Sequence, residues 1–127
     1  MFPSLWADDA HEMAQKVVIR QGISSISCAD AYALIESGTC TLLDVREKAE
    51  YDERHIPGAI NFPVDTINAE TASKILPDKN AVIVIYCLAG MRAASACIKL
   101  SDLGYRRLVN MGGISHWPYS TEQSKSN

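Results

Sequence analysis

An uninterrupted apolar run, Ala-Val-Ile-Val-Ile-Tyr, covers residues 81–86. A run without polar alternation is typical of a strand that is covered on both faces, as in a parallel sheet. Apolar residues then recur at helical spacing, which predicts a helix over residues 91–103 that ends before Gly104. Its buried stripe would comprise Ala93, Ala96, Cys97, Leu100 and Leu103. Residues 87–90 therefore lie where a buried strand gives way to a helix, the place where open α/β sheets bind ligands.

The same periodicities divide the rest of the chain into short elements. We expect strands at 23–26, 41–45, 59–61 and 107–110, and helices at 27–37 and 47–53. Residues 63–76 are expected to be irregular with at least one helical turn, 111–113 to form a loop, and 114–117 to form a last turn of helix. This alternation predicts an α/β fold with a mostly parallel sheet and right-handed crossovers.

An amphipathic pattern from residue 10 to about residue 20 precedes these elements and predicts a further helix. Its apolar face would carry Ala10, Met13, Ala14, Val17 and Val18. We expect this face to pack on its own domain; a dimer contact or a connection to another segment are the alternatives. The expected organisation is a helical extension at 1–22, one domain at 23–119 and a disordered, serine-rich tail at 120–127.

Composition narrows the class of protein. A chain of 127 residues with 47% hydrophobic and 21% charged residues suits one globular domain. The net charge of −3, without runs of like charge, argues against nucleic-acid or anionic-membrane partners. No apolar stretch reaches the length of a membrane span, and the first residues lack a signal-peptide pattern, so we expect a cytoplasmic location. The oligomeric state stays open between a monomer and a weak dimer.

The four cysteines, Cys28, Cys40, Cys87 and Cys97, show no C-x-x-C spacing and no accompanying histidine cluster. We therefore expect reduced thiols and no metal site. Cys97 lies on the predicted buried stripe and is interpreted as a core residue. Cys87 differs because it precedes a helix N-terminus, whose unpaired amides and dipole favour an anion.

Two neighbours strengthen the case for a reactive Cys87. Gly90 permits a tight backbone cradle around the sulfur, and Arg92 adds a permanent positive charge. Together with the loop amides these features favour the thiolate at neutral pH. The alternative is a buried structural cysteine, the usual state of a free thiol.

The spacing C-x4-R is one residue shorter than the C-x5-R loop of cysteine-dependent phosphatases, so the ring is better sized for one extra sulfur atom. C-x-x-G-x-R after a buried strand resembles the active-site loop of the rhodanese sulfurtransferases. D-V-R-E, E-Y and H-I-P-G-A-I-N over residues 44–61 resemble the second signature of that family, and Gly112-Gly113 followed by Trp117 also fits. Arg54 departs from the small residue that commonly precedes the histidine.

The resemblance implies the rhodanese fold, with five central strands and helices on both faces. It implies that Cys87 carries sulfane sulfur as a persulfide held by Leu88, Ala89, Gly90, Met91 and Arg92, with no metal or organic cofactor. The donor would be thiosulfate or a low-molecular-weight persulfide, and the acceptor cyanide, a thiol or a protein. Leu88 and Ala89 are uncharged where thiosulfate-specific rhodaneses often carry basic side chains, which favours the less charged persulfide. His55 would be structural rather than a base.

Asp44 and Arg46 follow a predicted strand at the same edge of the sheet as Cys87. We expect these two residues and Glu50 to brace the cysteine loop; a surface ion pair is the alternative for Asp44 and Arg46. Two other functions compete with sulfur transfer. One is a catalytically weak sulfur-carrier, docking or regulatory module of rhodanese type. The other is a phosphatase, which needs the longer loop and a general acid.

Overall fold

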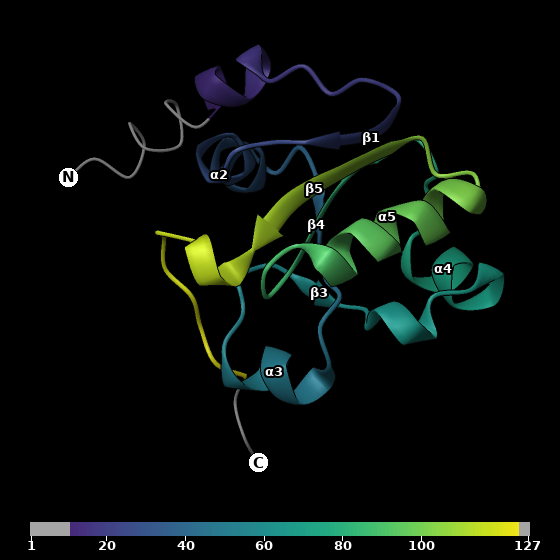
Figure 1. Cartoon of the computed structure of the whole chain (residues 1–127). Coiled ribbons are helices and arrows are strands. Elements are labelled where there is room, and N and C mark those ends of the chain that lie inside the picture. Colours follow the sequence, from purple (N-terminus) through teal and green to yellow (C-terminus); the bar gives the residue numbers. More distant parts are fainter. Residues whose placement is uncertain (1–10, 125–127) are drawn as a thin grey trace.

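The computed structural model describes residues 11–124, and these contain a five-stranded sheet in the order β1-β5-β4-β2-β3. Every pair of neighbouring strands is parallel, which confirms the predicted α/β fold (Figure 1). The strands are β1 (Gly22–Ser25), β2 (Thr41–Asp44), β3 (Ile60–Asn61), β4 (Val82–Cys87) and β5 (Arg107–Gly113). Parallel order brings the carboxyl ends of β2, β4 and β5 to one edge, and the chain places Cys87 there.

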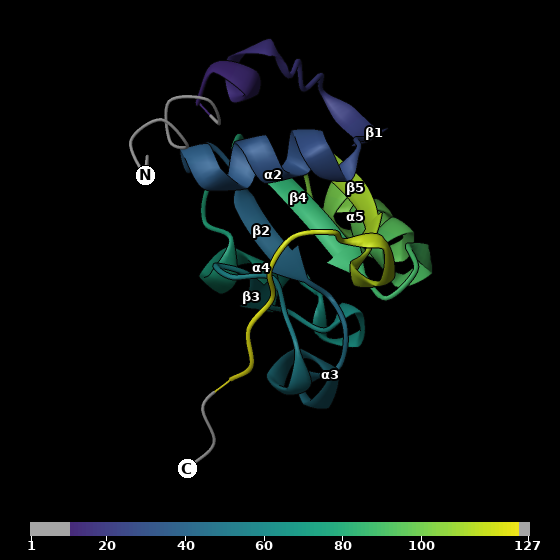
Figure 2. The same ribbon diagram turned by 90° about the vertical axis from the view of Figure 1, so that its left-hand side faces the viewer.

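Helices cover both faces of the sheet, as predicted. The helices are α2 (Cys28–Ser37), α3 (Lys48–Glu53), α4 (Ala69–Ile75) and α5 (Met91–Asp102), with short 3-10 turns η1 (Val64–Thr66) and η2 (Ile114–His116). Figures 1 and 2 show α2 on one side of the sheet and α5 on the other. None of the helices in residues 11–124 combines the length and apolarity needed to cross a membrane.

Alternate residues of the central strands fill two cores. Ile83, Ile85 and Cys87 of β4 face α4 and α5, whereas Val84 and Tyr86 face α2. The predicted stripe of α5 faces the first core, where Ala93, Ala96, Cys97 and Leu100 have no exposed surface. Local signals fix the ends of the helices: the Ser27 hydroxyl accepts the Asp30 N–H at the start of α2, and Gly38 ends that helix in the left-handed conformation.

The N-terminal helix ends earlier than predicted. Within the described chain it covers residues 11–16 rather than reaching residue 20, and Ala10 lies outside the described residues. Ala14 and Val17 pack against the core on the α2 side, which confirms contact with the domain. Met13 and Val18, expected on the same face, are 44% and 77% exposed. The helix ends where the β-branched run Val-Val-Ile begins, since such side chains lose rotamer freedom in a helix.

Strand β5 is longer than predicted, because residues 111–113 extend the strand instead of forming a loop. Gly113 pairs with Cys87 after a register irregularity between Ile85 and Cys87. The two glycines suggested a loop from their low strand propensity, but pairing with β4 overrides that preference. This extension brings the end of β5 against the cysteine loop.

The segment after Tyr119 was expected to be disordered, and for residues 120–124 that expectation is wrong. His55 and Glu122 form an antiparallel bridge in which each backbone N–H donates to the other residue's carbonyl at 2.9 Å. The Ser124 N–H donates to the Asp52 carbonyl, and the Trp117 indole N–H donates to the Ser120 carbonyl. This segment contains no apolar residues, and its contacts use hydrogen bonds of its backbone. Its composition therefore gave no signal that it is ordered. Residues 125–127 lie outside the described part.

We predict that Glu122→Pro lowers the free energy of unfolding by about 1–2 kcal/mol, because proline removes the N–H that donates to the His55 carbonyl together with the carboxylate 3.2 Å from the His55 Nε2. Urea unfolding followed by circular dichroism measures the change. Gln123→Pro is the matched control, since the Gln123 N–H donates to no residue in the range 11–124. Equal losses in the two variants would show that the bridge contributes nothing.

Candidate active site

Cys87 is the last residue of β4, and its side chain lies inside the turn that leads into α5. Its Sγ accepts the Gly90 N–H at 2.9 Å, so the sulfur contacts an amide at the start of a helix. Gly90 has φ of 111° and is the N-cap of α5, a backbone conformation that favours glycine. Cys87 is 2% exposed, yet its sulfur has this polar partner. The geometry suits a partly shielded anion at the helix N-terminus.

Two residues that the sequence analysis did not single out hold the loop from outside. The Leu88 carbonyl accepts the Ser115 N–H at 3.2 Å and the Ser115 hydroxyl at 2.8 Å. The Gly90 carbonyl accepts the Asn110 side-chain amide at 3.3 Å, while the Asn110 Oδ1 accepts the Gly112 N–H at 2.8 Å. With their carbonyls bound outside the loop, Leu88 and Gly90 keep those oxygens away from an anion at the sulfur. Asn110 lies within β5 and Ser115 lies two residues beyond its end, and these positions were the available signal.

Gly113 lies so close to the cysteine loop that there is no room for a side chain at this position. A Cβ on Gly113 would lie 1.8 Å from the Leu88 carbonyl oxygen and 2.6 Å from the Ala89 Cα. Both are backbone atoms, so a side chain there requires the loop to move. The close approach of β5 to the loop therefore depends on glycine at this position.

Arg92 and Glu50 join the loop to α3. The Arg92 Nη1 and Nη2 donate to the two Glu50 carboxylate oxygens at 2.7 and 3.0 Å. The hydrogen bond from Arg92 is the main reason that the pKa of Glu50 lies below its ordinary value, and Glu50 raises the pKa of Arg92 in turn. A bidentate pair of this kind fixes the orientation of both side chains. The direct contact between Glu50 and Arg92 supports the expected role of Glu50 in bracing the loop, and that role remains a proposal.

The ion pair also predicts a dependence of stability on pH. Because the pKa of Glu50 is lower in the folded protein than its ordinary 4.5, the unfolded chain binds the proton more readily. The stability that the pair contributes is complete above about pH 4.5 and is lost as the pH falls through the lowered folded pKa. Both side chains are about one-third exposed, so we expect Glu50→Gln to cost only about 0.5–1 kcal/mol at neutral pH.

Urea unfolding of the wild type and Glu50→Gln at a series of pH values tests this prediction. The difference in unfolding free energy should shrink below pH 4.5 and vanish once Glu50 is protonated. Glu70→Gln is the control, because Glu70 makes only an exposed ion pair with Lys74 at 3.9 Å. A difference that stays constant down to acid pH would contradict the assignment.

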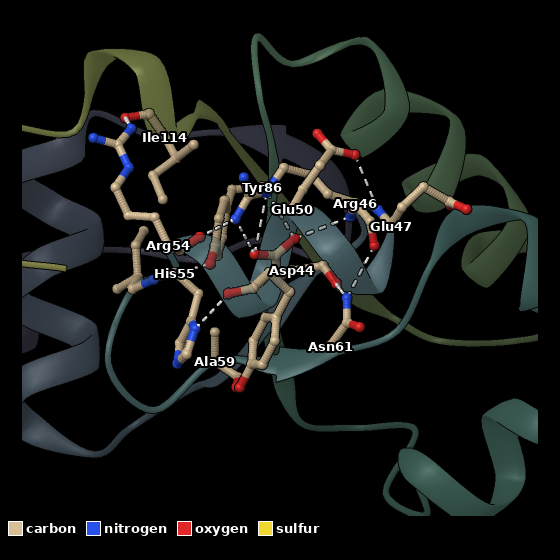
Figure 3. Close-up of polar contacts among 12 residues, drawn as sticks. Asp44, Arg46, Glu47, Glu50, Arg54, His55, Ala59, Asn61, Tyr86 and Ile114 are labelled. Atoms are coloured by element: carbon tan, nitrogen blue, oxygen red, sulfur yellow. Dashed lines mark hydrogen bonds and ion pairs between the residues drawn. The ribbon is translucent and has the colours of Figure 1, made fainter. Parts of the chain in front are cut away.

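Asp44 and Arg46 form a buried ion pair, so the surface-pair alternative is excluded: their side chains are 0% and 5% exposed. The Arg46 Nη2 donates to the Asp44 Oδ2 at 2.8 Å and also to the Arg54 carbonyl at the end of α3 (Figure 3). The Asn61 side-chain amide donates to the Asp44 and Arg46 carbonyls. These contacts hold α3 beside β2 and β3. Among residues 11–124 no hydrogen bond joins the Asp44 or Arg46 side chain to the cysteine loop, and the expectation that they brace it stays a prediction.

His55 packs against α3, and none of its hydrogen bonds in the described residues is to Cys87. Its ring stacks on Tyr51 at 3.8 Å between centroids, with Nδ1 2.7 Å from the Tyr51 carbonyl and Nε2 3.2 Å from Glu122. The Ile56 N–H donates to the hydroxyl of Tyr86, whose pKa is raised chiefly by burial. This arrangement agrees with a structural role for the histidine segment (Figure 3).

Burial raises the pKa of two of the other three thiols. Cys97 has no exposed surface, and burial raises its pKa to about 11, which confirms its place in the core. Burial raises the pKa of the Cys40 thiol to about 11 as well. Cys28 is half-buried, with its Sγ 3.8 Å from the His116 carbonyl. Cys28 is also at a helix start, as the first residue of α2, but among the four cysteines only the Cys87 Sγ accepts a backbone N–H in the described residues.

Comparison with known proteins agrees with this geometry. The family model described as Rhodanese-like domain matches residues 27–118. The thiosulfate sulfurtransferase PspE of Escherichia coli is 38% identical over 72 residues, which cover 57% of this chain and 68% of PspE. The probable adenylyltransferase/sulfurtransferase MoeZ of Mycobacterium tuberculosis is 34% identical over 119 residues, covering 91% of this chain but only 28% of MoeZ.

Among solved structures, a rhodanese with anions from E. coli has a TM-score of 0.61 and 32% sequence identity. The superposition covers 66% of this chain and 98% of that one. The predicted rhodanese fold is therefore confirmed in both sequence and architecture. The chain belongs to the rhodanese-like family.

Proposed function

We propose that this protein is a rhodanese-type sulfurtransferase that carries sulfane sulfur on Cys87. The observation that carries the proposal is the contact of the Cys87 Sγ with the Gly90 N–H at the N-terminus of α5. Relatives named as sulfurtransferases support the same class of reaction. An amide-lined loop at a helix N-terminus stabilises an anionic sulfur and, one bond further out, an anionic persulfide.

In the first half-reaction the Cys87 thiolate attacks the outer sulfur of thiosulfate. A new S–S bond forms, the bond to the sulfonate sulfur breaks, and sulfite leaves with the electron pair. A low-molecular-weight persulfide would react in the same way and release its thiol. In the second half-reaction cyanide, a thiol or an acceptor protein attacks the outer sulfur and regenerates the Cys87 thiolate. One nucleophile used twice predicts ping-pong kinetics.

The surrounding residues have distinct parts in this proposal. The loop amides of Leu88, Ala89, Gly90, Met91 and Arg92 surround the persulfide. Arg92 holds the loop closed through Glu50 rather than presenting a free guanidinium to the substrate. Asp44 and Arg46 keep α3, and therefore Glu50, in position. No metal or organic cofactor takes part in these steps.

Intact-mass spectrometry tests the proposal. After exposure to thiosulfate or glutathione persulfide and removal of the donor, the protein should gain one sulfur atom, and cyanide should remove it. Turnover should then give parallel lines in double-reciprocal plots at several cyanide concentrations. Sulfur that loads but never turns over would favour the catalytically weak carrier or regulatory module. Faster turnover of an aryl phosphate than of sulfur donors would favour the phosphatase.

A further inference from the structure

A hollow borders the cysteine loop on the side of β1 and β5. Its volume is about 440 Å3, and it is open to solvent. The loop contributes Ala89, Gly90 and Met91, and the remaining walls come from β1, α5 and β5. Gly90 is shared between the two sites, because its N–H contacts the Cys87 sulfur and its backbone lines the hollow. A molecule bound here therefore lies against the residue whose N–H contacts the Cys87 sulfur.

The walls are mainly apolar. Ile26, Met91, Ala94 and Met111 contribute apolar side chains, and the polar lining residues, such as Asn110, are uncharged. Met91 is 85% exposed in the first turn of α5, and Ala94 is exposed one turn further along the same face. Exposed apolar side chains that line a concavity are typical of a ligand site rather than of a solvated helix face.

The guanidinium groups near the loop are already occupied. Both Nη atoms of Arg92 donate to the Glu50 carboxylate, and Arg46 is buried in an ion pair with Asp44. Arg54 extends toward the Ile114 carbonyl on the α3 side and does not line the hollow. The sulfonate end of thiosulfate therefore finds no free bidentate donor at the hollow, whereas an apolar substituent finds a complementary surface.

We propose that this hollow binds the apolar substituent of the sulfur donor. The inference rests on the proposed function and names its substrate class: organic sulfane donors in which an aryl or alkyl group is attached to the group that leaves. The substituent packs on Met91 and Ala94 while the sulfane sulfur enters the loop. The Cys87 thiolate attacks that sulfur, a persulfide forms, and the organic fragment departs with the bonding electron pair.

Two thiosulfonates of equal charge test this. Benzenethiosulfonate and methanethiosulfonate are both monoanions and release sulfinates, so they differ mainly in apolar surface. We expect kcat/KM for loading to be about tenfold higher with the benzene donor, after division by each donor's rate with free cysteine. Met91→Ser should lower this ratio about fivefold, and Ala94→Gln, which places an amide in the hollow, should lower it as well.

Ile98→Ser is the matched control. Ile98 is 57% exposed on α5 and does not line the hollow, so the ratio should stay at the wild-type value. A ratio near one in the wild type, or a ratio that Met91→Ser and Ala94→Gln leave unchanged, would overturn the inference while sulfur transfer itself stands. Failure of both donors and of thiosulfate to load Cys87 would instead overturn the proposed function.

Discussion

Cys87→Ser is expected to lose at least about 10³-fold of the turnover of sulfane sulfur to cyanide, down to the background rate. The serine hydroxyl fits the same loop and can accept the Gly90 N–H that now contacts the Cys87 sulfur. It cannot form the S–S bond on which the transfer depends, so packing is retained while the chemistry is lost. Thiocyanate formation measures the turnover, and intact mass should show no added sulfur after treatment with donor.

Cys97→Ser separates this effect from the loss of a thiol in general. Cys97 is fully buried in the core below α5, so its replacement adds a buried hydroxyl and should lower stability by about 1–3 kcal/mol. Sulfur loading should nevertheless persist in this variant, because Cys97 is not the nucleophile. Loading that survived Cys87→Ser and disappeared in Cys97→Ser would transfer the proposed role to the core cysteine.

The strand, loop and helix around Cys87 could be predicted because their signals are local. The apolar run before the loop, the stripe from Ala93 to Leu100 and the glycine at the N-cap each act over a few residues. The parallel sheet followed from the same alternation of strands and helices. The start of α2 was predictable for the same reason, since Ser27 caps an amide only three residues away.

The parts that could not be predicted depend on long-range pairing. Asn110 and Ser115 hold the loop across 20 and 27 residues of sequence, and their contacts exist only because β5 continues beside β4. The order of residues 120–124 likewise depends on backbone hydrogen bonds to α3 and to His55. His55 and Glu122 are 67 residues apart in the chain. Backbone groups and single polar side chains make these contacts. They therefore produce no hydrophobic periodicity in the sequence from which they could be predicted.

Gly113→Ala is expected to reduce sulfur loading at Cys87 by at least about tenfold and to lower the free energy of unfolding by about 1–3 kcal/mol. The added Cβ would lie 1.8 Å from the Leu88 carbonyl oxygen and 2.3 Å from its carbon. Backbone atoms cannot rotate away as a side chain could, so the loop must shift outward. That shift breaks the Ser115 contacts to the same carbonyl and displaces the amides around the sulfur. Donor loading by intact mass and urea unfolding measure the two effects.

Gly58→Ala distinguishes loop displacement from the general cost of replacing a glycine. Gly58 has φ of 88°, so alanine is strained there, but its Cβ would meet no heavy atom within 4 Å. This variant should lose about 1 kcal/mol of stability while loading sulfur at the wild-type rate. Gly113 has φ of −140°, which any residue adopts, so its cost comes from the clash with the loop alone. If Gly113→Ala loaded sulfur as fast as Gly58→Ala, the position of the loop against β5 would have no part in the reaction.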